Sequence, residues 1–442
     1  MEITHNSPIA VPSSPSTASG NLADSGTRVL DRIAVLDILR GIALVGMFMV
    51  HFNLYEATPF GAEPGPAAAF IEKFIGMFIE ERFWGMFGML FGIGFAVQLT
   101  RADARGEPFI ARYLRRLAGL AVFGFIAEGV FGYNVLFGYA MWGLPLILVR
   151  RWPVKALVVL LAICMSSFQL RTVARLAYYS RQPNGMTQFM EASKARAIAW
   201  RATWDANHAV EESGDWKTVI AARIRFMAKF QRQWGLMPSG SFTLFLLGLI
   251  GFRLGLFSRP EEHRRMIVAL MVYGAVCGLL ADHIFPIGGP VSSGPPTGFV
   301  DGVVTSARTS GFNFFRPQWL AFTYIGTVLL LVSYNRAWLH RLSGFKWAGR
   351  MALTNYMMQV VLVDVLFTHH GFGMKIPALL VFPGAIGLFV AQIFMSRWWL
   401  TRFRLGPLEW IWRSITYWKV QPLRIEGPVA VPALALAGQV SE

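Results

Sequence analysis

Apolar runs close to the roughly 20 residues that an α-helix needs to cross a bilayer recur along the chain, separated by short polar or basic segments. One of the first, Leu36–Phe52, reads LDILRGIALVGMFMVHF and contains Asp37, Arg40 and His51. An ionisable side chain inside such a run costs several kcal/mol, so each of the three is a functional candidate. At about 100° per residue they share one helix face. Arg40 and His51 are then roughly 16 Å apart along the helix axis, at about 1.5 Å rise per residue.

Ten such runs predict an all-α fold, a polytopic integral membrane bundle of about ten transmembrane helices (eight to eleven). The ten spans are expected near Ile33–Tyr55, Arg82–Leu99, Arg116–Gly132, Asn134–Val149, Val154–Leu170, Phe242–Phe257, Met266–Phe285, Trp319–Tyr334, Ala348–Thr368 and Ala378–Trp398. In the second span, Gly85, Gly88 and Gly92 fall on one face, a spacing that lets another helix approach closely.

The charged residues predict the topology of these spans. Lys and Arg gather in the even-numbered connections and after the last span, which places those segments and both termini in the cytoplasm. We therefore divide the chain into residues 1–30, a disordered cytoplasmic tail; 31–170, an N-terminal transmembrane half; 171–237, a long amphipathic-helical outer loop; 238–420, a C-terminal transmembrane half; and 421–442, a tail.

Composition supports a membrane protein. The chain has 442 residues, of which 54% are hydrophobic and only 15% are charged, against about a quarter charged in soluble domains. The net charge of +16 resides in the loops between spans, where it sets topology and meets anionic headgroups. We therefore expect no nucleic-acid partner. The two cysteines lie in apolar runs and predict neither a disulfide framework nor a metal site.

Five residues are the candidates for chemistry. His51 titrates near neutral pH and is the candidate general base. Asp37, one helical turn before Arg40, is expected to form an ion pair with it. Arg115 and Arg116 begin the third span and are candidates for holding the phosphates of a nucleotide-like donor. The structural alternatives are that His51 packs between helices and that the arginines snorkel to headgroups or set topology.

Other polar residues carry weaker signals. Asn355 and Gln359 are four residues apart and are expected to hydrogen-bond across the bundle. Glu128 lies at the end of the third span. Adjacent His369 and His370 point about 100° apart on a helix, so no metal site is predicted.

Several motifs resemble a known family. RIAVLDILRGIALVGMFMVH, FGMLFGIGFAVQLTRADARG and RYLRRLAGLAVFG resemble the N-terminal half of the YeiB-like bacterial membrane proteins. GRMALTNYMMQVVLVDVLF, followed by SRWWLTRFRLGPLEWIWRSITYWK, resembles their C-terminal block, domain of unknown function 418. The chain departs from the YeiB-like pattern in two places. That pattern usually has Asn where this chain has His51. It also carries a His and an Asp-Ile-Leu around the third and fourth spans, where this chain has no His and Asn134 stands at the Asp position. Acyltransferase family 3 proteins instead have an Arg, ten further residues and then a His in their first helix, and Arg40 and His51 of this chain have the same spacing.

The resemblance implies a transmembrane O- or N-acyltransferase of the bacterial inner membrane. It would move an acyl group from a cytoplasmic acyl-CoA-type donor, with no tightly bound cofactor, to a hydroxyl or amine of an envelope glycan or lipid. His51 would act as the base, and Arg40, oriented by Asp37, would bind donor phosphates or the oxyanion. A small-molecule transporter or flippase, and a non-enzymatic envelope scaffold or sensor, are the alternatives. The donor, the acceptor and the oligomeric state are left open.

Overall fold

The computed structural model describes residues 18–53, 65–133, 135–232, 240–284, 300, 303–304, 319–375 and 377–425. Within these ranges the fold is all-α, and the one extended pairing is an isolated bridge between Phe403 and Arg424. The elements are α1 (Ala18–Asn53), α2 (Pro66–Phe78), α3 (Arg82–Ala104), α4 (Phe109–Phe125), the π-helical turn η1 (Ile126–Val130), α5 (Leu136–Gly143), α6 (Leu146–Val149), α7 (Val154–Tyr179), α8 (Gly185–Ser213), α9 (Trp216–Phe230), α10 (Ser241–Arg253), α11 (Arg264–Ile284), α13 (Leu320–Tyr334), α14 (Ala337–Arg341), α15 (Ser343–Arg350), α16 (Ala352–Phe367), α17 (Ala378–Leu400) and α18 (Pro407–Tyr417).

Among the described residues, fewer helices are long and apolar enough to cross a membrane than the sequence predicts. Ala34–Phe52 and Ala68–Ala104 meet both conditions, and a pair within α7, bent by 52°, adds a third if it is one span. Ser241–Arg253, Leu320–Tyr334 and Ala352–Phe367 are apolar but shorter. The predicted count of about ten spans is therefore not confirmed. One physical reason is that the predicted fourth span is broken into α5 and α6 at Leu144–Pro145, since proline lacks the amide hydrogen that continues a helix.

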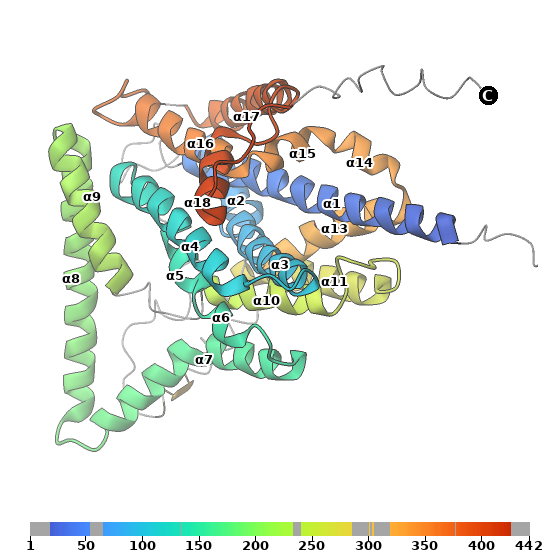
Figure 1. Ribbon diagram of the computed structural model, residues 1–442. Helices are drawn as coiled ribbons and strands as arrows, with labels where there is room; N and C mark the ends of the chain where they lie inside the picture. The colour runs from blue at the N-terminus through green and yellow to red at the C-terminus, as the bar shows by residue number, and fades with distance from the viewer. Residues whose placement is uncertain are drawn as a thin grey trace, which may run out of the picture.

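The boundaries of the first helix also differ from the expected ones. α1 begins at Ala18, so it extends into the segment expected to be a disordered tail, and residues 1–17 lie outside the described ranges. Part of α1 is wrapped by the rest of the protein, because Ile38, Leu39, Ala43, Leu44 and Phe48 are fully buried. α1 packs against α15, α3, α17 and α16, and it runs through the middle of the bundle (Figure 1).

Glycines set the closest helix contacts. A Cβ added to Gly92 of α3 would overlap the carbonyl oxygen of Phe245 in α10, and one added to Gly248 of α10 would overlap that of Met89. At Gly88 an added Cβ would lie 2.9 Å from Leu244. The prediction that a small-residue face on this helix admits a neighbour is confirmed, and the neighbour is α10.

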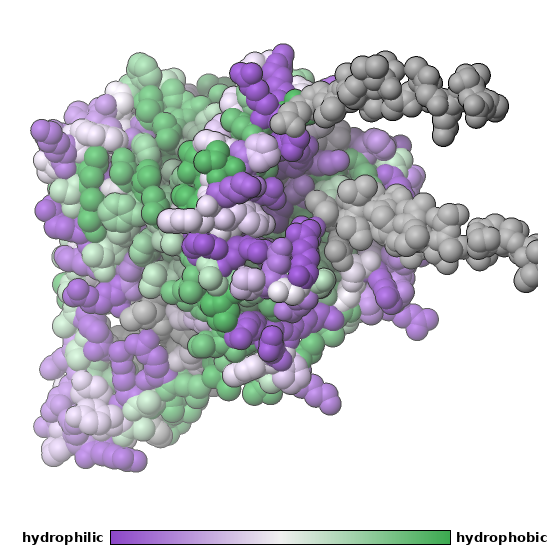
Figure 2. All heavy atoms as spheres, viewed as in Figure 1, coloured by the Kyte–Doolittle hydropathy of each residue, from purple (hydrophilic) through white to green (hydrophobic). Residues whose placement is uncertain are grey.

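The described part of the segment predicted as an outer loop, residues 171–232, is largely helical. The end of α7 leads into α8 and α9, a hairpin at one end of the molecule in which α8 runs across the direction of α1 (Figure 1). The Asp215 side chain begins α9 by accepting a hydrogen bond of 3.0 Å from the Thr218 amide. Figure 2 shows hydrophobic residues in a band beside the α8–α9 end and along the lower edge of the visible face, and hydrophilic ones at the α8–α9 end, at the centre and at the opposite end.

Replacing Gly92 with Ala should destabilise the protein, since the new methyl group meets a backbone carbonyl that cannot rotate away. Overpacking of this kind costs about 1–3 kcal/mol. The matched control is Gly387→Ala in α17, where an added Cβ meets nothing within 4 Å and the substitution improves helix propensity. Thermal unfolding of the two purified variants in detergent is the measurement. Equal midpoints would contradict the proposed contact.

Candidate functional site

Two cavities lie along α1, among the described residues. The first, of about 760 Å³, contains His51, and we name it the histidine cavity. The second, of about 670 Å³, contains Asp37 and Arg40, and we name it the arginine cavity. α1 thus presents one end of its polar face to each cavity. The structure brings Asp37 and Arg40 together and places His51 elsewhere, in agreement with their spacing along the helix.

The arginine cavity is strongly positive. Eight arginines and three carboxylates are among its lining residues, and the arginines are Arg40, Arg101, Arg105, Arg112, Arg116, Arg350, Arg404 and Arg413. They come from both halves of the sequence, on α1, α3, α4, α15 and α18 and in the connections that follow α3 and α17. A cluster of guanidinium groups in a concave site is suited to a ligand with several phosphate or carboxylate groups.

Three contacts organise the arginine cavity. Arg40 donates to the Asp37 carboxylate at 2.7 Å, which confirms the predicted ion pair. The Arg116 guanidinium lies 4.1 Å from the ring centre of Trp412, whose indole nitrogen donates to the Arg116 carbonyl at 2.8 Å. Arg116 therefore faces the cavity in a fixed position. Arg115, the second predicted phosphate-binding residue, is not among the lining residues.

The histidine cavity is aromatic and mildly acidic. Its walls carry Trp84, Trp142, Trp204, Phe226, Phe230, Glu81, Glu128, Glu211, Asn207 and Gln231, together with His51 and His208. The Glu128 carboxylate is 4% exposed and accepts hydrogen bonds of 3.3 Å from the Gln231 side chain. The α8–α9 hairpin supplies one wall, so the loop predicted between residues 171 and 237 contributes directly to this cavity.

His51 lies at the inner end of the histidine cavity. Its ring centre is 4.4 Å from that of Tyr133 and 6.0 Å from that of Tyr356. The side chain is buried, and its Nδ1 atom has no hydrogen-bond partner among the described residues. Tyr133 lines the histidine cavity, whereas Tyr356 lines the arginine cavity. The His51–Tyr356 ring contact therefore joins a residue that lines one cavity to a residue that lines the other.

Sequence reasoning missed Tyr356 and Glu409. Glu409 of α18 accepts hydrogen bonds from the backbone amides of Leu353 (2.6 Å) and Thr354 (3.1 Å) and from the Thr354 hydroxyl (2.6 Å). It thus stabilises the N-terminus of α16, next to Tyr356. Burial raises the pKa of the Glu409 carboxyl, and the hydrogen bonds from Thr354 and Leu353 oppose that rise. In the sequence these residues lie in the motifs LTNY and GPLEW. No local pattern indicates that the two motifs contact each other.

Polar side chains also join α16 to α17. Asn355 donates to the Ser396 hydroxyl at 2.9 Å, and Gln359 donates to Gln392 at 2.8 Å. The prediction that Asn355 and Gln359 hydrogen-bond across the bundle is confirmed. Both side chains are fully buried, and hydrogen bonds between buried side chains restrict the motion of the helices that carry them.

A buried ion pair attaches α9 to α16. Arg223 donates to Asp364 at 3.0 Å, and each side chain is 2% exposed. Asp364 also lies 3.1 Å from His370, and Arg223 donates to the Val130 carbonyl at 2.6 Å. Within the described residues no group of three His, Cys, Asp or Glu side chains is arranged to hold a metal ion. The contacts of Asp364 and His370 therefore serve to dock the hairpin.

Comparison with known proteins identifies the family. Residues 32–192 match the family described as "Heparan-alpha-glucosaminide N-acetyltransferase, catalytic", and residues 251–419 match "Protein of unknown function (DUF418)". "Uncharacterized protein YxaH" of Bacillus subtilis is 30% identical over 423 residues, which cover 89% of this chain and 96% of that protein. "Uncharacterized protein YeiB" of Escherichia coli is 26% identical over 90% of this chain and 98% of its own length. The chain belongs to the YeiB-like family. No solved structure gives a significant match.

The two matched segments meet in the arginine cavity. Arg40 and Arg116 belong to residues 32–192, whereas Arg350, Tyr356 and Arg413 belong to residues 251–419. By contrast, the part of the histidine cavity formed by residues 204–241 lies outside both segments. The arginine cavity is therefore the site that the shared family segments build together.

Replacing Asp364 with Asn should loosen the α8–α9 hairpin, because it removes the buried carboxylate that pairs with Arg223 at 3.0 Å and leaves Arg223 with the more distant Glu211 carboxylate, 3.5 Å from its Nε. Breaking one side of a buried pair costs about 3–5 kcal/mol. The matched control is Asp205→Asn, since Asp205 pairs with Arg201 at the surface, where such pairs contribute about 0–1 kcal/mol. Limited proteolysis between residues 185 and 230 and thermal unfolding report the two effects. Indistinguishable variants would contradict the docking role.

Proposed function

We propose that the protein is a membrane-embedded acyltransferase. It moves an acyl group from an acyl-CoA-type thioester in the arginine cavity to a hydroxyl or amine of an envelope glycan or lipid in the histidine cavity. The observation that carries the proposal is the approach of a basic cavity and an aromatic, acidic cavity at the His51–Tyr356 contact. The match of residues 32–192 to an acetyltransferase catalytic domain supports the same class of reaction.

The proposed topology assigns each cavity to one side of the membrane. The chain would cross the bacterial inner membrane about ten times, with both termini in the cytoplasm, as the distribution of Lys and Arg favours. The arginine cavity then opens toward the cytoplasm, where acyl-CoA is made. The histidine cavity faces outward, where envelope glycans and lipids lie.

His51 is the proposed general base. The acceptor oxygen or nitrogen attacks the thioester carbonyl carbon, and its proton passes to the His51 imidazole. A new C–O or C–N bond forms, and the carbonyl oxygen becomes an oxyanion. The C–S bond then breaks, and the leaving thiolate takes the proton back from His51. Proton transfer by a positioned histidine typically contributes about 10²–10⁴-fold to such a rate.

Arg40 and Arg116 are the proposed phosphate-binding residues. Asp37 holds Arg40 in place at 2.7 Å, and Trp412 holds Arg116 at 4.1 Å, so neither guanidinium must be ordered when the donor binds. Arg115 does not line the cavity, and we therefore assign the role to Arg116 rather than to the pair.

A transporter is the second candidate, and the presence of two cavities along α1 is the observation that supports it. Cavities on either side of a closed constriction also characterise alternating-access carriers. The two functions differ in their products. A carrier moves its substrate unchanged into proteoliposomes, whereas an acyltransferase releases a free thiol from acyl-CoA.

Replacing Arg116 with Gln should weaken binding of CoA by about tenfold to 100-fold, because a hydrogen bond to a charged group contributes about 1.5–3 kcal/mol. The matched control is Arg115→Gln, which removes the same charge one residue away and outside the cavity lining. Titration calorimetry of CoA into the purified full-length protein is the measurement. Equal weakening in both variants would show that only the net charge matters.

Replacing His51 with Gln should lower acyl transfer by about 10²–10⁴-fold and leave the affinity for CoA unchanged, since His51 lines the other cavity. Transfer of a labelled acetyl group from acetyl-CoA to glucosamine, an amine acceptor, and to methyl glucoside, a hydroxyl acceptor, is measured in proteoliposomes. Full activity in this variant would exclude His51 as the base. Uptake of the sugar without acetylation would favour the carrier.

A further inference from the structure

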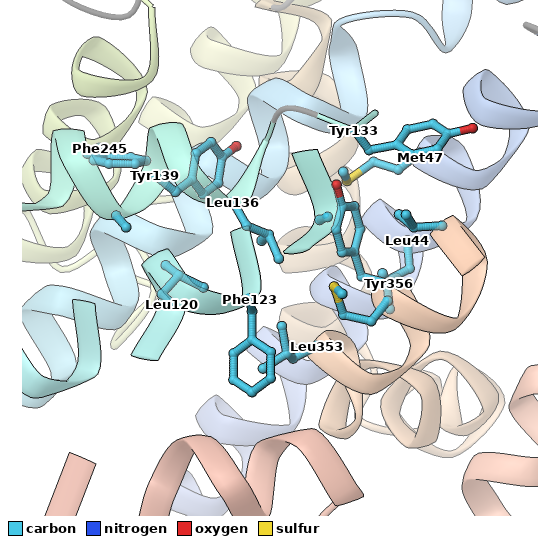
Figure 3. Packing of buried hydrophobic residues seen from close by; sticks show 14 of the residues in the cluster. Leu44, Met47, Leu120, Phe123, Tyr133, Leu136, Tyr139, Phe245, Leu353 and Tyr356 are labelled. Carbon is cyan, nitrogen blue, oxygen red and sulfur yellow. The ribbon is translucent and has the colours of Figure 1, made fainter. Parts of the chain in front are cut away.

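The linings of the two cavities contact one another through aromatic rings. Tyr356 lines the arginine cavity, while His51 and Tyr133 line the histidine cavity, and the three rings contact one another in the order Tyr356, His51, Tyr133. Figure 3 shows the phenol of Tyr356 rising from α16 toward Met47 and Tyr133, both of which line the histidine cavity. The Tyr356 hydroxyl therefore points from one cavity toward the other.

The hydroxyl of Tyr356 has no hydrogen-bond partner in the part of the chain that the structure describes. Tyr356 is 1% exposed, and its Oη atom makes no hydrogen bond among the described residues. Two other buried tyrosines that line the arginine cavity differ: Tyr113 donates to the Gly143 carbonyl and Tyr139 to the Trp84 carbonyl, each at 3.1 Å. A buried hydroxyl without a partner is costly, and a phenylalanine would fill the same space without that cost. The hydroxyl is therefore available to a ligand.

Tyr356 is held firmly in place. Glu409 fixes the first turn of α16 through the Leu353 and Thr354 amides, immediately before Tyr356. Asn355 and Gln359 tie the same helix to α17. A hydrogen-bond donor aimed by a rigid helix at developing charge needs little reorganisation during the reaction, which is the property of an oxyanion site.

We propose that the Tyr356 hydroxyl donates a hydrogen bond to the oxyanion formed from the acyl thioester, with His51 on the other side of the same carbonyl carbon. This inference rests on the proposed acyltransferase function. The acceptor's proton passes to His51, and the Tyr356 O–H group stabilises the negative charge on the carbonyl oxygen. When the C–S bond breaks, the carbonyl group forms again, and the leaving thiolate takes the proton from His51. Arg40, roughly 16 Å along α1 from His51, is left to bind donor phosphates.

Replacing Tyr356 with Phe tests the inference, because it keeps the ring that separates the cavities and removes only the hydroxyl. We expect kcat for thiol release from acetyl-CoA to fall by about 10²–10³-fold, with KM and the affinity for CoA unchanged. The assay uses membrane vesicles from cells that overproduce the full-length protein. The matched control is Tyr324→Phe, since Tyr324 lines neither cavity and its hydroxyl donates to the Phe78 carbonyl at 2.7 Å.

The outcomes separate the two proposals. Wild-type vesicles with no thiol release above control vesicles would overturn the proposed function and this inference with it. Wild-type activity together with an unchanged kcat in Tyr356→Phe, or a raised KM alone, would overturn this inference and leave the proposed function standing.

A second variant carries a fluorinated tyrosine at position 356, whose phenol ionises at lower pH than that of tyrosine. Its kcat should fall at a lower pH than that of the wild type, because an ionised phenol cannot donate, and an unshifted pH profile would overturn the inference.

Discussion

The backbone contact between α1 and α15 is the constraint on which the arginine cavity depends. A Cβ on Gly41 would overlap the Phe345 carbonyl, and a Cβ on Gly349 would overlap the Asp37 carbonyl. Only residues without a side chain allow two helices to approach this closely. α1 belongs to the segment matched by the acetyltransferase domain and α15 to the DUF418 segment. The contact therefore brings Arg40 from one segment and Arg350 from the other to a single cavity.

The charged residues are paired in two different ways. Arg223 and Asp364 are each 2% exposed and satisfy one another, as a buried pair must. In the arginine cavity, eight arginines face three carboxylates, and Glu409 is occupied by the N-terminus of α16. The side chains of the cavity therefore leave a surplus of positive charge. A polyanionic ligand would supply the missing negative charge, which is the electrostatic basis for a phosphate-bearing donor.

The sequence predicted those features that depend on spacing along one helix. The all-α class, the Asp37–Arg40 ion pair and the glycine face of α3 all follow from helical periodicity. The partners of these features were not predictable, because they lie far along the chain: Glu409 contacts Leu353 across 56 residues. The same holds for the Tyr356 hydroxyl, because its lack of a partner among the described residues depends on how the helices pack and not on any motif. The number of spans is not confirmed, in part because apolar runs such as Asn134–Val149 do not reveal where a helix breaks.

The two cavities explain the spacing of Arg40 and His51 along α1, because each residue lines a different cavity. Eleven residues of α-helix separate them by roughly 16 Å, which is too far for both to act on one carbonyl group. An acyl-CoA, however, carries its phosphates and its thioester at opposite ends of a long, flexible pantetheine arm. A site for such a donor needs cationic groups at one end and a base at the other. Arg40 at the arginine cavity and His51 beyond Tyr356 fit that requirement, so their separation along α1 supports donor binding by Arg40 and leaves the oxyanion to a nearer group.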